Sequence, residues 1–307
     1  MPYLYLSLAA LFWGGNYVVG KLMVANVDPV LLSQARWLLT SLLLVIINYR
    51  PLTQSLHNIR QSWKTLTMLA ICGQVLFPLT LYIGLQYTTS LNAAIYLSAT
   101  PCLVLSINRF VFGDAVSRAN WLGVAASTLG VAWLVTMGDL SNLHFLQHFN
   151  KGDLWTLLSA ASWALYCAFL RTKPKTVPAG VFVTYSALVG TVLLIPFSVA
   201  TVYLTPNALP ALLNGTISGW GLAYLVIFPS WLAYLFWSRG IAELGATRGE
   251  IFTHLVPLSG GALSVVFLGT PLHAYHWVSL ALIASGVVIC AVKPKATAYR
   301  DTSSPAT

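Results

Sequence analysis

Long apolar stretches make up most of this chain, and short polar breaks separate them. A helix that crosses a bilayer core of about 30 Å needs roughly 20 apolar residues. Turn residues such as Asp28-Pro29, Gly113-Asp114 and Lys173-Pro174 mark the breaks. The pattern predicts an all-α membrane protein with ten transmembrane helices, at 3–24, 29–48, 64–86, 91–112, 118–137, 153–170, 179–204, 219–241, 247–269 and 276–292.

Composition agrees with this pattern. The chain has 307 residues, of which 57% are hydrophobic and 7% are charged, whereas a soluble domain has about 25% charged residues. Lipid can replace the missing polar shell, so the predicted partners are a bilayer and a small-molecule solute. The four cysteines lie in apolar stretches without CxxC spacing, so we expect no metal site and no cofactor. We expect a monomer or weak dimer.

Basic residues predict the orientation of the chain. With ten spans, 13 of the 16 Lys and Arg residues fall on the side of the N-terminus and 3 on the other side. Cytoplasmic loops carry the Lys and Arg excess, so both termini are predicted to be cytoplasmic in a multi-pass cell (inner) membrane protein. The same distribution explains the net charge of +9 without a nucleic-acid partner. The polar tail 293–307 is predicted to be a disordered cytoplasmic segment.

The chain contains an internal repeat. Residues 84–135 align with 240–291 at a constant offset of 156, and this register pairs Pro101 with Pro257 and Trp121 with Trp277. Near the start of each half the offset is 150, which pairs Trp13 with Trp163. The predicted repeats are 1–138 and 150–292. Each holds five helices, an odd number, so the second repeat is inverted, as in many transporters.

Particular motifs resemble those of a known family. They are Phe12-Trp13-Gly14-Gly15-Asn16, Ala35-Arg36-Trp37-Leu38-Leu39 and the long segment from Gly84 to Val135. On these residues the chain resembles the EamA-like branch of the drug/metabolite transporter superfamily, of the aromatic amino acid and metabolite exporter type. The resemblance implies a ten-helix fold of two EamA repeats that exports amino acids, metabolites or drugs. The family's usual Glu after the glycine that ends the fourth helix is Asp114 here.

The function that follows is transport of small organic solutes by alternating access, in the direction of export. Uptake or bidirectional facilitation of metabolites is the alternative. An intramembrane enzyme is a remote alternative, because Ser259 near His254 lacks the sequence context of a serine protease site. A channel would need a wide or charged-ring pore, for which the sequence has no pattern.

Several polar and aromatic residues inside predicted spans are candidates to line a solute cavity. Mid-membrane Trp and amide side chains need polar partners, which a wet cavity supplies. Interhelical packing or hydrogen bonding is the alternative for each residue. An aromatic wall with few charges favours hydrophobic amino acids or cationic drugs as solutes. The candidates are Trp13, Asn16, Gln74, Tyr82, Asn92, Tyr96, Trp163, Tyr166, Tyr234 and His254.

Two prolines and a pair of ionisable residues complete the candidates. Pro101 and Pro257 fall near the middle of the fourth and ninth spans, where they predict hinges; a static kink is the alternative. Glu250 and His254 are spaced i, i+4 and can couple transport to protons, although a structural role is favoured. Arg36, in the second span, can snorkel outward or bind an anionic group, and a structural role is favoured for it too.

Overall fold

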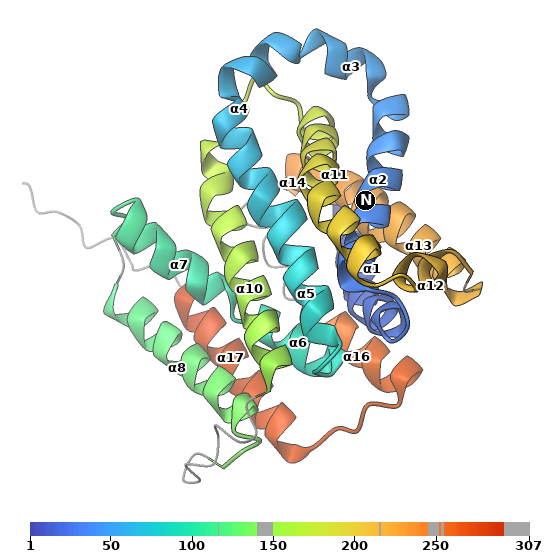
Figure 1. The fold of residues 1–307 in the computed structure, drawn as a ribbon. Coiled ribbons are helices and arrows are strands. Elements are labelled where there is room, and N and C mark those ends of the chain that lie inside the picture. Colours follow the sequence, from blue (N-terminus) through green and yellow to red (C-terminus); the bar gives the residue numbers. More distant parts are fainter. Residues whose placement is uncertain (116, 140–149, 215, 245–251, 253–254, 292–307) are drawn as a thin grey trace, which may run out of the picture.

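The structure is a computed structural model, and it describes residues 1–115, 117–139, 150–214, 216–244, 252 and 255–291. The described residues are helical almost throughout and contain no β-strand, which confirms the predicted all-α class. Glu250, His254 and the predicted tail 293–307 lie outside the described residues. Figure 1 traces the order of the helices from the N-terminus in blue to the last helix in red.

The first 139 residues form eight α-helices and one π-helical segment. Two pairs of these helices replace single predicted spans. One pair is joined through the π-helical segment and begins at Leu56, earlier than the predicted start at residue 64. The elements are α1 (Pro2–Val24), α2 (Pro29–Ile47), α3 (Tyr49–Gln54), α4 (Leu56–Ala70), η1 (Ile71–Leu76), α5 (Phe77–Leu85), α6 (Ser90–Leu97), α7 (Thr100–Val111) and α8 (Arg118–Val135).

The described residues from 150 onward repeat this plan, with the short helix α12 in the place of α3 and an additional 3₁₀ turn. Another π-helical segment again interrupts a long helix. The elements are α10 (Lys151–Phe169), the 3₁₀ turn η2 (Leu170–Thr172), α11 (Ala179–Leu204), α12 (Ala208–Asn214), α13 (Thr216–Ile227), η3 (Phe228–Leu232), α14 (Ala233–Leu244), α16 (Leu255–Leu268) and α17 (Ala274–Ala291).

Five stretches of the described chain are long and apolar enough to cross a membrane. They are Pro29–Ile47, Leu56–Leu85, Lys151–Thr172, Ala179–Leu204 and Gly219–Trp237, and a bent pair made of α6 and α7 would be a sixth. On α11 many large apolar side chains, such as Val192, Phe197 and Val199, are exposed, as expected of a helix that faces lipid. The ten-span count stays a prediction.

The two π-helical segments lie at equivalent repeat positions. The offset of 156 that relates residues 84–135 to 240–291 also carries residues 71–76 onto 227–232, and η3 occupies 228–232. A proline accompanies each segment: Pro229 lies inside η3 and Pro78 follows η1. Proline lacks the N–H that an α-helix needs, and a π-bulge accommodates that loss.

The predicted mid-helix position of Pro101 is wrong. The fourth span is broken at Ser98 and Ala99, and α6 and α7 are bent by 41°. Pro101 lies in the first turn of α7, where its missing N–H removes no intrahelical hydrogen bond. Pro257 is buried, at the third residue of α16 as described. The hinge role of both prolines stays a prediction.

The helices pack in reciprocal pairs between the two halves of the sequence. α8 lies along α17, and α2 lies along α11; Figure 1 shows α8 beside α17. α1 packs against α14 and α16, while α10 packs against α5, α6 and α7. The first helix of each repeat therefore packs against the third and fourth spans of the other repeat.

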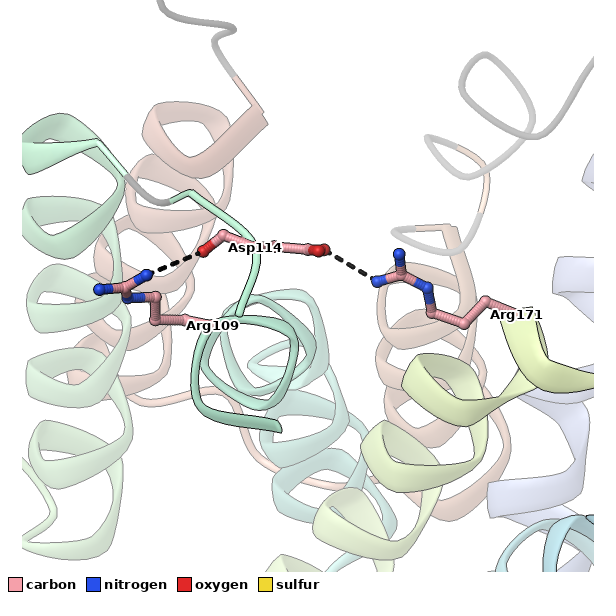
Figure 2. Close-up of polar contacts among 3 residues, drawn as sticks. All are labelled: Arg109, Asp114 and Arg171. Atoms are coloured by element: carbon pink, nitrogen blue, oxygen red, sulfur yellow. Dashed lines mark hydrogen bonds and ion pairs between the residues drawn. The ribbon is translucent and has the colours of Figure 1, made fainter. Parts of the chain in front are cut away.

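Asp114 connects the end of α7 to the end of α10. Its carboxylate pairs with Arg171 at 2.9 Å, and its backbone carbonyl accepts a hydrogen bond from Arg109 at 3.4 Å, as Figure 2 shows. Gly113 precedes it with φ of +72°, a left-handed conformation that suits glycine. Nearby, Lys173 donates to the carbonyls of Pro174 and Val177, and partial burial lowers its pKa. The acidic residue at this helix end is therefore a structural link.

Candidate functional site

Trp13 joins α1 to the π-helical segment of the eighth predicted span. Its indole Nε1 donates to the carbonyl of Pro229 at 3.0 Å. α10 makes equivalent contacts to the other π-helical region. Ser162 donates to the carbonyl of Cys72 and Ser159 to that of Phe77, each at 2.8 Å. Each irregular segment is thus held by the first helix of the opposite half, which gives backbone carbonyls the partners that lipid cannot supply.

An aromatic cluster lies where these elements meet. Trp13 contacts Trp163, Tyr234 and Trp237, with ring centroids 6.2, 5.4 and 5.4 Å apart. Trp163 continues the cluster, since it stacks on Tyr166 at 4.9 Å and contacts Phe77 at 4.8 Å. Trp13, Trp163 and Tyr234 are all partly exposed, although Trp13 and Trp163 lie inside long helices and Tyr234 lies just after η3 in the middle of its predicted span. The structure therefore brings four predicted residues together: Trp13, Trp163, Tyr166 and Tyr234.

Gln74 is a buried polar residue beside this cluster. It lies in η1, is fully buried, and neither its amide oxygen nor its amide nitrogen has a hydrogen bond of standard geometry. The hydroxyls of Tyr166 and Tyr234 lie close enough to interact with this amide, so Gln74 connects the aromatic cluster to η1.

Arg36 is the centre of a buried hydrogen-bond network. Its side chain is 4% exposed and does not snorkel. Nη1 donates to the hydroxyl of Tyr82 at 2.6 Å and to Oδ1 of Asn16 at 3.1 Å, and Nε donates to Ser230 at 2.7 Å. Tyr82 in turn donates to Asn16 at 2.8 Å. The network joins α1, α2, α5 and η3 through a single guanidinium group.

Ser230 links this network to the backbone irregularity at Pro229. Proline at position 229 leaves the carbonyl of Leu225, four residues earlier, without its helical donor. The hydroxyl of Ser230 donates to that carbonyl at 2.7 Å while its oxygen accepts from Arg36. The predicted residues Asn16 and Tyr82 are thus brought together here, one helical turn from Trp13.

Asn92 and Tyr96 lie in a different part of the molecule. Oδ1 of Asn92 accepts a 3.2 Å hydrogen bond from Nε2 of His276 in α17, whose Nδ1 accepts from the backbone N–H of His273. Tyr96 is buried with Ile95, Leu134 and Ile283. Neither residue has a described contact with the aromatic cluster. Their role in solute binding stays a prediction, as does that of His254, which is outside the described residues.

Polar contacts between the two halves gather around residues 88–92. Thr88 donates to Asp153 at 2.8 Å, Ser90 lies 2.6 Å from the hydroxyl of Ser264, and Asn92 binds His276. We call these three contacts the 88–92 junction. Lys21 supports it by donating to the carbonyls of Leu85 and Thr88 at 2.6 and 2.9 Å, beside a pocket of about 340 Å³.

Several of these residues had only weak signals in the sequence. Ser230 occupies the repeat position of Gln74, so the offset of 156 could have identified it. Phe77 and Trp237 are aromatic residues among many. Arg36 stands out in the sequence as a charged residue inside a predicted span. Its partners come from three other elements, and no spacing in the sequence predicts such contacts.

Comparison with known proteins identifies the family. The sequence model of the EamA-like transporter family matches residues 1–136 and, again, residues 150–292. The chain therefore belongs to the EamA-like transporter family, and it is an integral membrane transport protein, not an enzyme.

Relatives of nearly the same length carry transporter names. The uncharacterized transporter YyaM of Bacillus subtilis is 28% identical over 290 residues, which cover 93% of this chain and 92% of the relative. A probable amino-acid metabolite efflux pump of Salmonella typhimurium is 24% identical over 309 residues, covering 92% of each chain. A protein crystal structure with a TM-score of 0.61 and 19% identity covers 94% of this chain and 95% of its own, and it supports the fold.

Proposed function

We propose that this protein exports small organic solutes, amino acids or related metabolites, by alternating access between two inverted five-helix repeats. The repeats are residues 1–138 and 150–292, and the ten spans place both termini in the cytoplasm of a cell membrane. The contact between Trp13 and Trp163, 6.2 Å apart at equivalent repeat positions, is the observation that carries the proposal. It places partly exposed aromatic rings between the two halves.

The reciprocal packing of the helices supports the two-repeat arrangement. α1 and α10 occupy matching positions, and each packs against the third and fourth predicted spans of the other half, the third of which contains the π-helical segment. Two similar halves can pack in two equivalent asymmetric ways, so that each arrangement opens one side of the membrane. Pro101 follows the break between α6 and α7, and Pro257 is its partner in the repeat. We propose that both positions deform during the exchange.

The 88–92 junction is the proposed closed side of this conformation. In the proposed topology Lys21 and Lys151 are extracytoplasmic, and the junction lies at the same end of α1 and α10. Its direct contacts between halves close that side, so a solute would enter from the cytoplasm. These contacts must break for the solute to leave.

The direction of transport is proposed as export because one relative is named a probable amino-acid metabolite efflux pump. A bidirectional facilitator is the second candidate. Variants of Glu250 and His254, the proposed proton-coupling pair, distinguish coupled export from facilitation. Solute accumulation that is driven by a pH gradient and lost in Glu250→Gln and His254→Gln supports coupled export. Counterflow without pH dependence supports a facilitator.

Counterflow in proteoliposomes tests the proposed function. Vesicles loaded with hydrophobic amino acids and related metabolites are expected to take up the labelled solute in exchange, and the Trp13→Ala/Trp163→Ala variant is expected to lose most of this exchange. The control is Trp121→Ala/Trp277→Ala, another matched pair that lies on α8 and α17 with exposed rings. Equal loss in both variants, or none in either, would contradict the proposed site.

A further inference from the structure

Arg36 carries a buried positive charge that the described protein does not neutralise. Its three hydrogen-bond acceptors, on Asn16, Tyr82 and Ser230, are all neutral. The ion pair found among the described residues joins Arg171 to Asp114 and does not involve Arg36. Arginine cannot lose its proton in a protein, and an unpaired buried charge is strongly unfavourable. The site therefore favours a negative charge from elsewhere.

One nitrogen of the guanidinium group remains available for that charge. Nε and Nη1 make all the hydrogen bonds that Arg36 has within the described part of the chain, and Nη2 makes none there. Nη2 is also not among the polar atoms that are both completely buried and unpaired, so it reaches accessible space. A carboxylate oxygen can accept a charge-assisted hydrogen bond from Nη2.

The aromatic cluster lies close to Arg36 and favours an apolar group in a molecule bound there. Trp13, one turn from Asn16 on α1, binds the carbonyl of Pro229, which adjoins Ser230. Tyr234 belongs to the same aromatic cluster, because its ring contacts Trp13 at 5.4 Å. Arg36 and Trp13 are thus both held by the same short segments of α1 and η3.

We propose that Arg36 binds the carboxylate of the transported solute while the aromatic cluster binds its apolar part. The solute class is a monocarboxylate with an aromatic or large aliphatic group. Cationic drugs that lack a carboxylate are disfavoured, because the Arg36 charge repels them. The inference rests on the proposed transport function and names the chemistry of its substrate.

A matched pair of probes tests the inference. 3-Phenylpropionate and 3-phenylpropanamide have nearly the same size, but only the first is an anion. Equilibrium binding to the purified full chain is expected to favour the carboxylate by roughly tenfold or more, the scale of one charge-assisted interaction. Arg36→Gln is expected to abolish the preference, and Arg36→Lys to retain part of it. Arg118→Gln, which removes an exposed charge at the start of α8, is the control that keeps it.

Asn16→Asp tests the inference without removing the arginine. This isosteric change puts a carboxylate where Oδ1 already lies 3.1 Å from Nη1, so the protein neutralises its own charge. The carboxylate preference is expected to disappear while thermal denaturation confirms a folded protein. Equal binding of both probes by the unmodified protein, or an unchanged preference in Asn16→Asp, overturns the inference. Counterflow of other solutes in that case would leave the proposed transport function standing.

Discussion

Trp13 donates its indole N–H to the carbonyl of Pro229, 3.0 Å away on the far half of the sequence. The contact connects a helix near the N-terminus to the π-helical segment η3, where the backbone departs from regular α-helix. Trp163 stands at the equivalent position of the second half, yet within the described residues its indole N–H has no hydrogen bond of this kind. The two tryptophans therefore share a place in the aromatic cluster but differ in what they stabilise.

This difference predicts unequal effects of the same substitution. Trp13→Phe keeps an aromatic ring but leaves the carbonyl of Pro229 without its donor, which costs about 1–3 kcal/mol when no water replaces it. Trp163→Phe loses no such bond and is the matched control. Thermal denaturation in detergent is expected to show a lower midpoint for Trp13→Phe only. Equal midpoints for the two variants would mean that the hydrogen bond does not stabilise η3.

Tyr82 is predicted to stabilise the buried Arg36 network through its hydroxyl. Tyr82→Phe removes an acceptor of Nη1 and a donor to Asn16, and we expect a loss of about 1.5–3 kcal/mol because one partner is charged. Tyr17→Phe is the control, since Tyr17 is also buried on α1 but makes no hydrogen bond among the described residues. Denaturation midpoints of the two variants compare them directly, and similar values would contradict the network's importance.

Lys21 is predicted to stabilise the end of α5. Its ammonium group donates to the carbonyls of Leu85, the last residue of α5, and of Thr88, which follows that helix. Carbonyls at a helix C-terminus lack a helical donor. Lys21→Met keeps the apolar stem and removes both bonds, for an expected loss of about 1–2 kcal/mol. Lys64→Met, on the exposed face of α4, is the control. A midpoint unchanged in Lys21→Met would refute the capping role.

The ion pair of Asp114 and Arg171 is predicted to contribute little to stability. The two side chains are 41% and 49% exposed, and exposed pairs are worth at most about 1 kcal/mol. Asp114→Asn is therefore expected to shift the midpoint slightly, and less at high salt. Asp114→Glu restores the family's usual residue and should behave like the unmodified protein. A large loss in Asp114→Asn would assign this helix end a greater role than the contact in Figure 2 supports.

The sequence predicts the helices well because each needs only a run of apolar residues with turn chemistry at its ends. Asp28 caps α2 as its position before Pro29 suggests. The offset of 156, extended back to residues 71–76, relates the two π-helical segments, but it does not predict that they are π-helical. The period of a π-helix differs too little from 3.6 for a short segment to reveal it. The break before Pro101 was missed for a similar reason, since a proline alone does not distinguish a kink from a new first turn.

The site was harder to predict than the helices, because its contacts join residues far apart in the chain. Trp13 and Trp163 could be paired through the repeat, and the structure brings them together. Arg36 lies 194 residues from Ser230, and only the packing of α2 against η3 makes them neighbours. Asn92 and Tyr96 share a helix face at i, i+4 spacing, which suggested a common role in a solute cavity. In the structure Asn92 contacts His276 of α17, and Tyr96 is buried in an apolar cluster with Leu134 and Ile283.

Alternating access requires the 88–92 junction to open during transport, and a reversible cross-link shows whether it does. Ser90 and Ser264 are buried and their hydroxyls are 2.6 Å apart, so Ser90→Cys/Ser264→Cys can form a disulfide across the two halves. The background would have its four native cysteines replaced, and the two single variants would control for the substitutions. Solute counterflow is predicted to stop when the double variant is oxidised and to return on reduction. Undiminished counterflow in fully cross-linked protein would contradict alternating access through this junction.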